Sequence, residues 1–160
     1  KKLLGLVPLA REGGFFAETY RAHEVLPTGT LDPGRPGGRS LASAIYYLLT
    51  PGTFSALHRL HSDEVFHFYL GDPVEMLQLL PHGEGRVQVL GTDLIAGMRP
   101  QVVVPRGVWQ GTRLIPGGRM ALLGTTVSPG FDPRDYEQGE RNTLVAAYPA
   151  FREGILALTS

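Results

Sequence analysis

Short runs of alternating apolar and polar residues fill most of this chain, and glycine or proline interrupts them about every ten residues. The runs are rich in Val, Ile, Leu, Phe and Tyr, which is typical of β-strands. We predict strands at Phe15–Tyr20, Ser43–Leu49, Phe54–Leu60, Glu64–Leu70, Val74–Leu80, Arg86–Leu90, Gln101–Val104, Gly111–Ile115 and Met120–Val127. Many short strands at this spacing favour an all-β sandwich or barrel.

Glycine and proline cluster between the predicted strands. The segment Pro27–Gly38 has almost no apolar content, so we predict a mobile loop there. The segments Gly71–Pro73, Pro81–Gly85 and Pro116–Gly118 predict hairpin connections.

Near its end the chain changes from a period of two to helical spacing. Leu144, Val145 and Tyr148 lie on one helical face, and Pro149 ends the pattern. We therefore predict one short helix over about 140–148, packed across a barrel end. A chain of 160 residues is about the length of one domain, so we predict a single domain over residues 1–160.

Composition narrows the classes of function. Fifteen basic residues balance fifteen acidic ones, which disfavours nucleic acid and anionic membranes as partners. Cysteine is absent, which excludes disulfides, thiolate zinc sites and cysteine nucleophiles. No apolar run reaches the length of about 20 residues that spans a bilayer. We expect a soluble, cytoplasmic protein.

The stretch from Gly52 to Gly71 carries the main candidate chemistry. Strand alternation puts His58 on the same face as the small and apolar residues beside it, which predicts an interior position. Glu64 is the first residue of the next predicted strand, and alternation places its side chain on the same face as those of Phe66 and Phe68. If both faces point inward, an imidazole and a carboxylate converge in an aromatic-walled cavity. They either transfer protons near neutral pH or form only a structural hydrogen-bonded pair.

A second anchor region follows at Pro105, Gly107 and Gln110. Together, the two stretches resemble the signature motifs of the cupin barrels. In that family the first motif supplies two histidines and a glutamate as metal ligands, and the second supplies a further histidine. Here Leu60 replaces the second histidine of the first motif, and Gln110 replaces the histidine of the second.

The resemblance extends over nearly the whole chain. Further blocks match at Glu12–Arg21, Ser43–Leu49, Pro100–Pro105 and Val127–Phe131. They resemble an uncharacterised cupin branch, a domain of unknown function related to sugar-nucleotide epimerases. The resemblance implies a double-stranded β-helix, or jelly-roll barrel, and a homodimer. We expect the second subunit to pair with the apolar N-terminal segment, because an exposed strand edge tends to be covered.

Three functions stay open at this point. In the first, the barrel binds a small polar molecule such as a sugar or nucleotide derivative, and isomerises or epimerises it without metal. His58 is then the base, Glu64 orients it, and other residues contact the ligand. The candidate ligand contacts are Gln110, Gln101, His67, Phe66 and Trp109.

The second function is that of a metal-dependent oxygenase or isomerase, and the third involves no catalysis. His58, Glu64 and Gln110 form the reduced metal-ligand set, which His61 or His67 completes only if a bulge turns one of them inward. We expect no cofactor, with a weakly bound divalent metal as the alternative. A non-catalytic barrel that binds a ligand is the third possibility.

Overall fold

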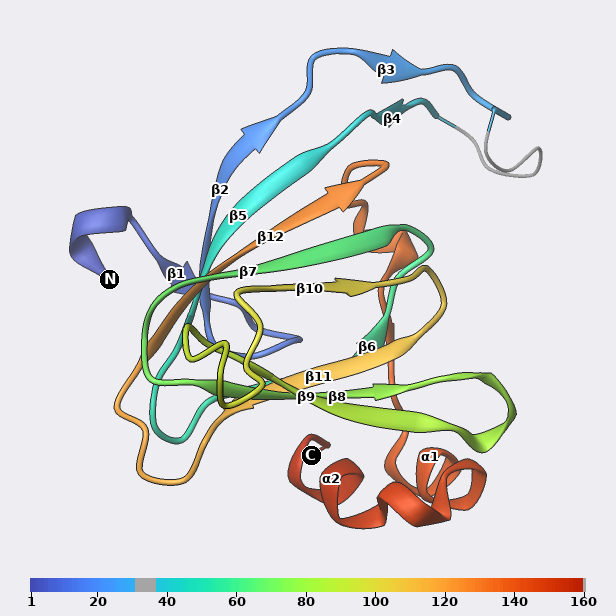
Figure 1. The fold of residues 1–160 in the computed structure, drawn as a ribbon. Helices are drawn as coiled ribbons and strands as arrows, with labels where there is room; N and C mark the ends of the chain where they lie inside the picture. The colour runs from blue at the N-terminus through green and yellow to red at the C-terminus, as the bar shows by residue number, and fades with distance from the viewer. Residues whose placement is uncertain (31–36, 160) are drawn as a thin grey trace.

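The structure is a computed structural model that describes residues 1–30 and 37–159. Within these residues, two antiparallel sheets face one another (Figure 1). The larger sheet has the order β1 (Val7–Pro8), β2 (Phe15–Arg21), β5 (Ser43–Leu49), β12 (Ala121–Ser128), β7 (Asp63–Gly71) and β10 (Gln101–Val104). The smaller sheet has the order β13 (Glu137–Gln138), β6 (Phe54–Arg59), β11 (Trp109–Leu114), β8 (Val74–Leu79) and β9 (Gly85–Leu90). This arrangement confirms the predicted β fold.

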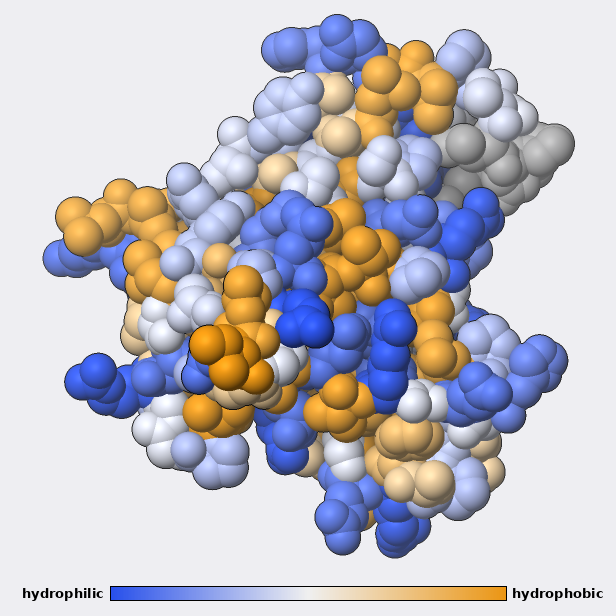
Figure 2. Space-filling view, viewed as in Figure 1, coloured by the Kyte–Doolittle hydropathy of each residue, from blue (hydrophilic) through white to orange (hydrophobic). Residues whose placement is uncertain are grey.

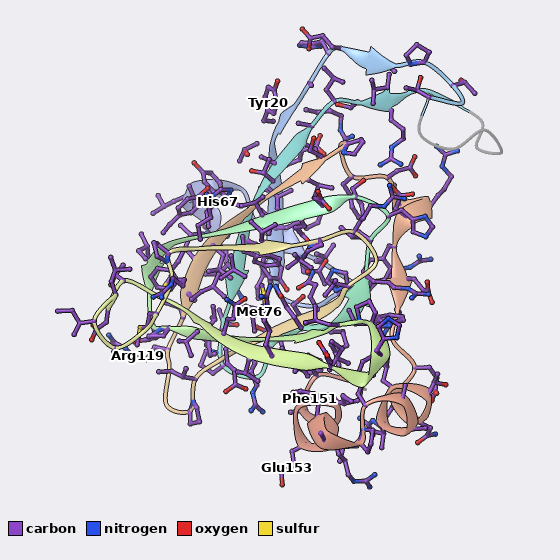
Figure 3. The ribbon with its side chains drawn as sticks, turned by 45° about the vertical axis from the view of Figure 1, so that its right-hand side comes forward. Tyr20, His67, Met76, Arg119, Phe151 and Glu153 are labelled. Carbon is purple, nitrogen blue, oxygen red and sulfur yellow. The ribbon has the colours of Figure 1, made fainter. Side chains whose placement is uncertain are left out.

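The main core lies between the two sheets. Tyr47, Phe66 and Leu123 point inward from the larger sheet, and Met76 meets them from β8 in the smaller sheet. Figure 3 shows Met76 between the layers. Each such side chain contributes about 1.5–3 kcal/mol when it is fully buried. The inward residues follow the predicted alternation, because successive side chains of a strand point to opposite faces.

The C-terminal segment differs from the prediction. The expected helix is present as α1 (Arg141–Ala147), and the Glu140 side chain accepts hydrogen bonds from two backbone N–H groups of its first turn. A second helix, α2 (Arg152–Ala157), follows a 3₁₀ turn, η4 (Pro149–Phe151), and was not predicted. Both helices lie below the smaller sheet in Figure 1.

These helices cover a sheet face, and the prediction that they cross a barrel end was wrong. Outward apolar side chains of the smaller sheet pack against inward ones of the helices. The members of this second core are Leu57, Leu77, Leu79, Leu144, Ile155 and Leu158. Figure 3 places Phe151 beside this core, while Glu153 points away from the sheet. The outer face of the smaller sheet is apolar and needs this cover.

The predicted central strands are confirmed within one or two residues, with additional short elements around them. Residues 31–36 of the predicted loop Pro27–Gly38 lie outside the described residues. On either side of them, β3 (Val25–Leu26) and β4 (Arg39–Ser40) pair as an arm that projects beyond the sheets (Figure 1). The remaining 3₁₀ turns are η1 (Lys2–Leu4), η2 (Pro81–Gly83) and η3 (Pro133–Asp135).

The N-terminal segment partly covers the edge of the larger sheet. Strand β1 pairs with Phe15 and Phe16 of β2 and leaves the rest of that edge open. Beside it, Leu3 on η1 is almost fully exposed. The N-terminal turn lies at the left of Figure 1, and apolar residues form a projection on that side in Figure 2. The homodimer stays a prediction, and this surface is where we expect it. Within the described part of the chain, the helices are too short and too polar to cross a membrane.

Candidate functional site

A cavity of about 110 Å³ lies on the inner side of the larger sheet. Its walls are mainly apolar, and its polar groups come from separate elements. The apolar lining consists of Leu9, Phe16, Ala44, Ile45, Leu60, Val127 and Phe131. The polar lining consists of Glu12, Glu18, Ser43, His58, Glu64 and Thr125. A mostly apolar pocket with a few convergent polar groups is the usual form of a small-molecule site.

His58 is buried on β6 and fixed by its neighbours. Its Nδ1 lies 2.8 Å from the carbonyl oxygen of Ala56, and its Nε2 lies 2.7 Å from Nε2 of Gln110. The carbonyl can only accept, so Nδ1 carries the proton that it donates. An amide nitrogen donates, so Nε2 of the ring accepts. These partners favour the neutral ring with its proton on Nδ1.

Gln110 links His58 to Glu64. The register of β11 against β6 places Gln110 directly across from His58. Its Nε2 also donates to Oε2 of Glu64 at 3.0 Å, so one amide group serves both residues. Its Oε1 is buried without a hydrogen-bond partner among the described residues. The predicted convergence of His58 and Glu64 is therefore present, and Gln110 lies behind the cavity wall as the link between them.

The carboxyl group of Glu64 is buried and strongly perturbed. Burial raises its pKa most, the charge of Glu12 raises it further, and His58 and a hydrogen bond with Thr125 lower it. The pKa rises from 4.5 to about 7 as a result. A carboxyl group with a pKa near neutral can gain or lose a proton under physiological conditions.

Glu12 is a site residue that the sequence analysis did not single out. Its Oε2 lies 3.9 Å from Nε2 of His58, and its Oε1 accepts a hydrogen bond from Ser55 Oγ at 2.8 Å. The backbone fixes it as well, since its carbonyl accepts from the N–H of Ala56. Gly13 follows with a φ of 97°, and a Cβ there would collide with the carbonyl oxygen of Phe54. The two glycines after Glu12 are the feature of the sequence that could have indicated a tight turn at the site.

Tyr136 covers the far side of His58, also without having been predicted. The two rings stack with centroids 5.0 Å apart and planes 22° from parallel. The Tyr136 hydroxyl is buried and has no hydrogen-bond partner among the described residues. Burial and the charge of Glu12 raise its pKa. Tyr136 thus keeps the ring of His58 in place and keeps water from that side.

The other predicted ligand contacts lie outside the cavity lining. Phe66 is fully buried in the main core. His67 and Gln101 face outward on β7 and β10, where Gln101 Nε2 lies 3.2 Å from Nδ1 of His67. Trp109 packs on the outer core of the smaller sheet beneath the Arg59 guanidinium. Strand alternation accounts for these positions, because each of the three outward residues is an odd number of positions from an inward one.

Comparison with known proteins identifies the family. The family model described as Cupin superfamily (DUF985) matches residues 2–139. The chain belongs to this cupin family. A solved structure of protein SO0799 from Shewanella oneidensis is 36% identical, with a TM-score of 0.85 over 99% of this chain and 94% of that one. A hypothetical protein from Leishmania major is 31% identical, with a TM-score of 0.86 over 99% and 95% of the two chains.

A third relative of this cupin is also a protein without an assigned activity. The uncharacterised protein YML079W of Saccharomyces cerevisiae is 29% identical over 134 residues, which cover 79% of this chain and 67% of the relative. These relatives establish the fold and the family but bring no activity with them. The predicted relationship to sugar-nucleotide epimerases stays a prediction.

The geometry does not fit the metal centre that other cupins suggest. Gln110 presents its amide nitrogen, which cannot ligate, to both His58 and Glu64, so these two residues direct lone pairs at the amide. His61 is exposed and His67 faces outward, so neither completes the set. Among the described residues, no three His, Asp or Glu side chains are grouped so that they could hold a metal ion.

We therefore predict that this cupin binds no divalent metal tightly. Protein purified without a metal-affinity tag should contain well under one equivalent of Mn, Fe, Ni or Zn by elemental analysis, and dialysis should remove it. The physical reason is that a metal must first displace the amide of Gln110 from both partners. One equivalent that survives dialysis, and that His58→Asn removes, would contradict this prediction.

Proposed function

We propose that this cupin binds a small polar molecule in the cavity and exchanges a proton with it through Glu64. The observation that carries the proposal is the meeting of Glu64, Glu12 and His58 in one apolar-walled cavity. A buried carboxyl group with two charged or polar neighbours is typical of acid and base catalysts. Isomerisation or epimerisation of the ligand is the class of reaction that such proton exchange serves.

Glu64 is the better candidate for the base, and His58 for the positioning residue. Both nitrogens of His58 already have partners, in the Ala56 carbonyl and the Gln110 amide. Glu64 lines the cavity, and its protonation changes near neutral pH. His58 and Gln110 then act on the ligand only through Glu64. Gln110 positions the carboxyl group by a hydrogen bond, and His58 partly offsets the rise in its pKa.

Filling the cavity should abolish binding. Ile45 lines the cavity from β5, so the larger ring of Ile45→Phe should occupy the space of the ligand. Ligands are found by a thermal-shift screen of sugars, amines and organic acids. The substitution should weaken the binding of each such ligand by at least about tenfold. Val103→Phe is the matched control, because Val103 is a half-exposed β-branched residue on the outer face of the larger sheet. Equal binding by both variants would place the ligand elsewhere.

Proton exchange is the second measurement on the same ligands. At saturating ligand in D₂O, the wild-type protein should exchange a carbon-bound hydrogen, observed by NMR, and Glu64→Gln should slow this exchange by about 10² or more. Tyr136→Phe keeps the ring over His58 and should leave most of the rate intact. Exchange that persists in Glu64→Gln would remove Glu64 from the chemistry and leave a binding protein.

A further inference from the structure

The charges that face the cavity are almost all negative. Glu12, Glu18 and Glu64 contribute carboxylates, while no lysine or arginine is among the described residues that line it. Arg21 lies next to the lining and forms an ion pair with Glu18 at 2.6 Å. The ion pair neutralises the charge of Glu18, whereas His58, the ring next to Glu12 and Glu64, is neutral and brings no positive charge to them.

This lining disfavours an anionic ligand. A phosphate or carboxylate in the cavity would face Glu12 and Glu64 in a region with little water, where like charges repel one another strongly. Sites for phosphate normally supply arginine, lysine or the N-terminus of a helix. A sugar nucleotide, one of the ligands that the sequence suggested, lacks any such partner here.

The same lining suits a cation with an apolar body. Two carboxylates can accept hydrogen bonds from one ammonium group, and hydrogen bonds between charged groups are the stronger kind. The hydrocarbon part would contact Phe16, Ile45 and Phe131, whose side chains cannot coordinate an inorganic ion. Aromatic faces also attract organic cations.

We propose that the ligand of this cavity is a small organic cation, a protonated amine on a compact hydrocarbon body, held by Glu12 and Glu64. The proposal rests on the proposed function for the cavity and adds the class of molecule. The surroundings of Glu64 support it: the carboxyl group is buried, its hydrogen bonds come from the neutral side chains of Gln110 and Thr125, and the charge of Glu12 acts on it. A cation between Glu12 and Glu64 would compensate both carboxylates.

Three probes with the same carbon skeleton test the charge. Isobutylammonium chloride, isobutanol and sodium isobutyrate differ only in the polar group, and their binding is compared by calorimetry at pH 8 and constant ionic strength. We expect isobutylammonium to bind at least about tenfold more tightly than isobutanol, which is the ratio that one charge-assisted hydrogen bond supplies. Isobutyrate should bind most weakly of the three.

Conservative variants then locate the cation. Glu12→Gln and Glu64→Gln keep the shape of the cavity and the acceptor oxygens that Ser55 and Gln110 use, and each should reduce the preference for isobutylammonium by about tenfold. Glu75→Gln is the matched control, because Glu75 pairs with Arg113 on the other sheet. It should leave the preference unchanged.

Each of the other binding results would contradict a specific part of the two proposals for this cavity. If isobutanol or isobutyrate binds as tightly as isobutylammonium, and Ile45→Phe blocks it, the cavity is a ligand site and the cation class is wrong. If isobutylammonium binds equally well to Glu12→Gln and Glu64→Gln, it binds outside the cavity and the proposal is wrong. If none of the three binds, the cation class is wrong, while the screen with Ile45→Phe still decides the proposed function.

Discussion

Glutamine in place of Glu64 is expected to raise the free energy of unfolding at pH 8, by on the order of 3 kcal/mol. The pKa of this carboxyl group is about 7 in the folded protein and 4.5 when the group is solvated. The folded state therefore ionises Glu64 less readily than the unfolded state does. Above pH 7 the folded protein holds a buried charge that burial and Glu12 both oppose, and the neutral glutamine removes this cost.

The pH dependence follows from the same shift. Between about pH 4.5 and 7, the folded protein binds the Glu64 proton and the unfolded chain has lost it, so the contribution of Glu64 to stability falls as the pH rises. Below this window the contribution is neutral, and above it the full cost remains. Urea denaturation at pH 5, 6, 7 and 8 should show the gap between Glu64→Gln and the wild type widening with pH.

Comparing two variants isolates this one group. Other carboxylates with shifted pKa values, such as Asp132 and Glu140, titrate equally in both proteins, so their contributions cancel in the difference. Glu75→Gln removes a half-exposed carboxylate, and its stability should stay within about 0.5 kcal/mol of the wild type. A Glu64→Gln protein that is less stable than the wild type at pH 8 would show that the carboxylate is held by attractive contacts.

A stabilising substitution at Glu64 has a functional meaning. Cores normally exclude an ionisable group that lacks a charged partner, and sites that act on ligands are the common exception. The chain retains Glu64 at a cost to stability, as expected if selection acts on binding or proton transfer. Both proposals for this cavity therefore predict the same sign of the stability change.

Local periodicity explains what the sequence could predict. The alternation of β6 and β7 depends only on neighbouring residues, and it placed His58 and Glu64 on inward faces correctly. The sequence analysis named His67 as a candidate ligand contact, yet the same alternation puts its side chain on the outward face of β7, away from the cavity lining. Motif spacing also put Gln110 in the same candidate set as His58, and the cross-strand register places the two residues opposite each other.

Residues that reach the site from distant elements were the ones missed. Glu12 enters from the turn before β2, and its position depends on hydrogen bonds to β6 that no local pattern encodes. Tyr136 reaches His58 because β13, which follows Tyr136 directly, returns to pair with β6. The helix α2 was missed for a different reason: it is only six residues long and contains Gly154, which weakens helical propensity.

A buried ion pair fixes the segment that leads to Tyr136, and its loss should strongly destabilise the protein. Nη1 of Arg39, on β4, lies 2.6 Å from Oδ2 of Asp135, and Nη2 of Arg39 donates to the carbonyl of Gly130 at 2.7 Å. Both side chains are buried. Removing one member of such a pair typically costs about 3–5 kcal/mol, because the other charge stays buried.

Arg39→Met is therefore expected to lower the free energy of unfolding by about 3–5 kcal/mol in urea denaturation, and Arg39→Met with Asp135→Leu should recover most of the loss. Arg59→Met is the matched control, since Arg59 pairs with Glu137 at the surface and the pair contributes at most about 1 kcal/mol. Similar losses in the two arginine variants would mean that solvent reaches Asp135. Asp135 directly precedes Tyr136, so Arg39→Met should also make the Tyr136 ring that stacks on His58 less well fixed. The folded fraction of this variant should therefore bind cavity ligands more weakly than the wild type does.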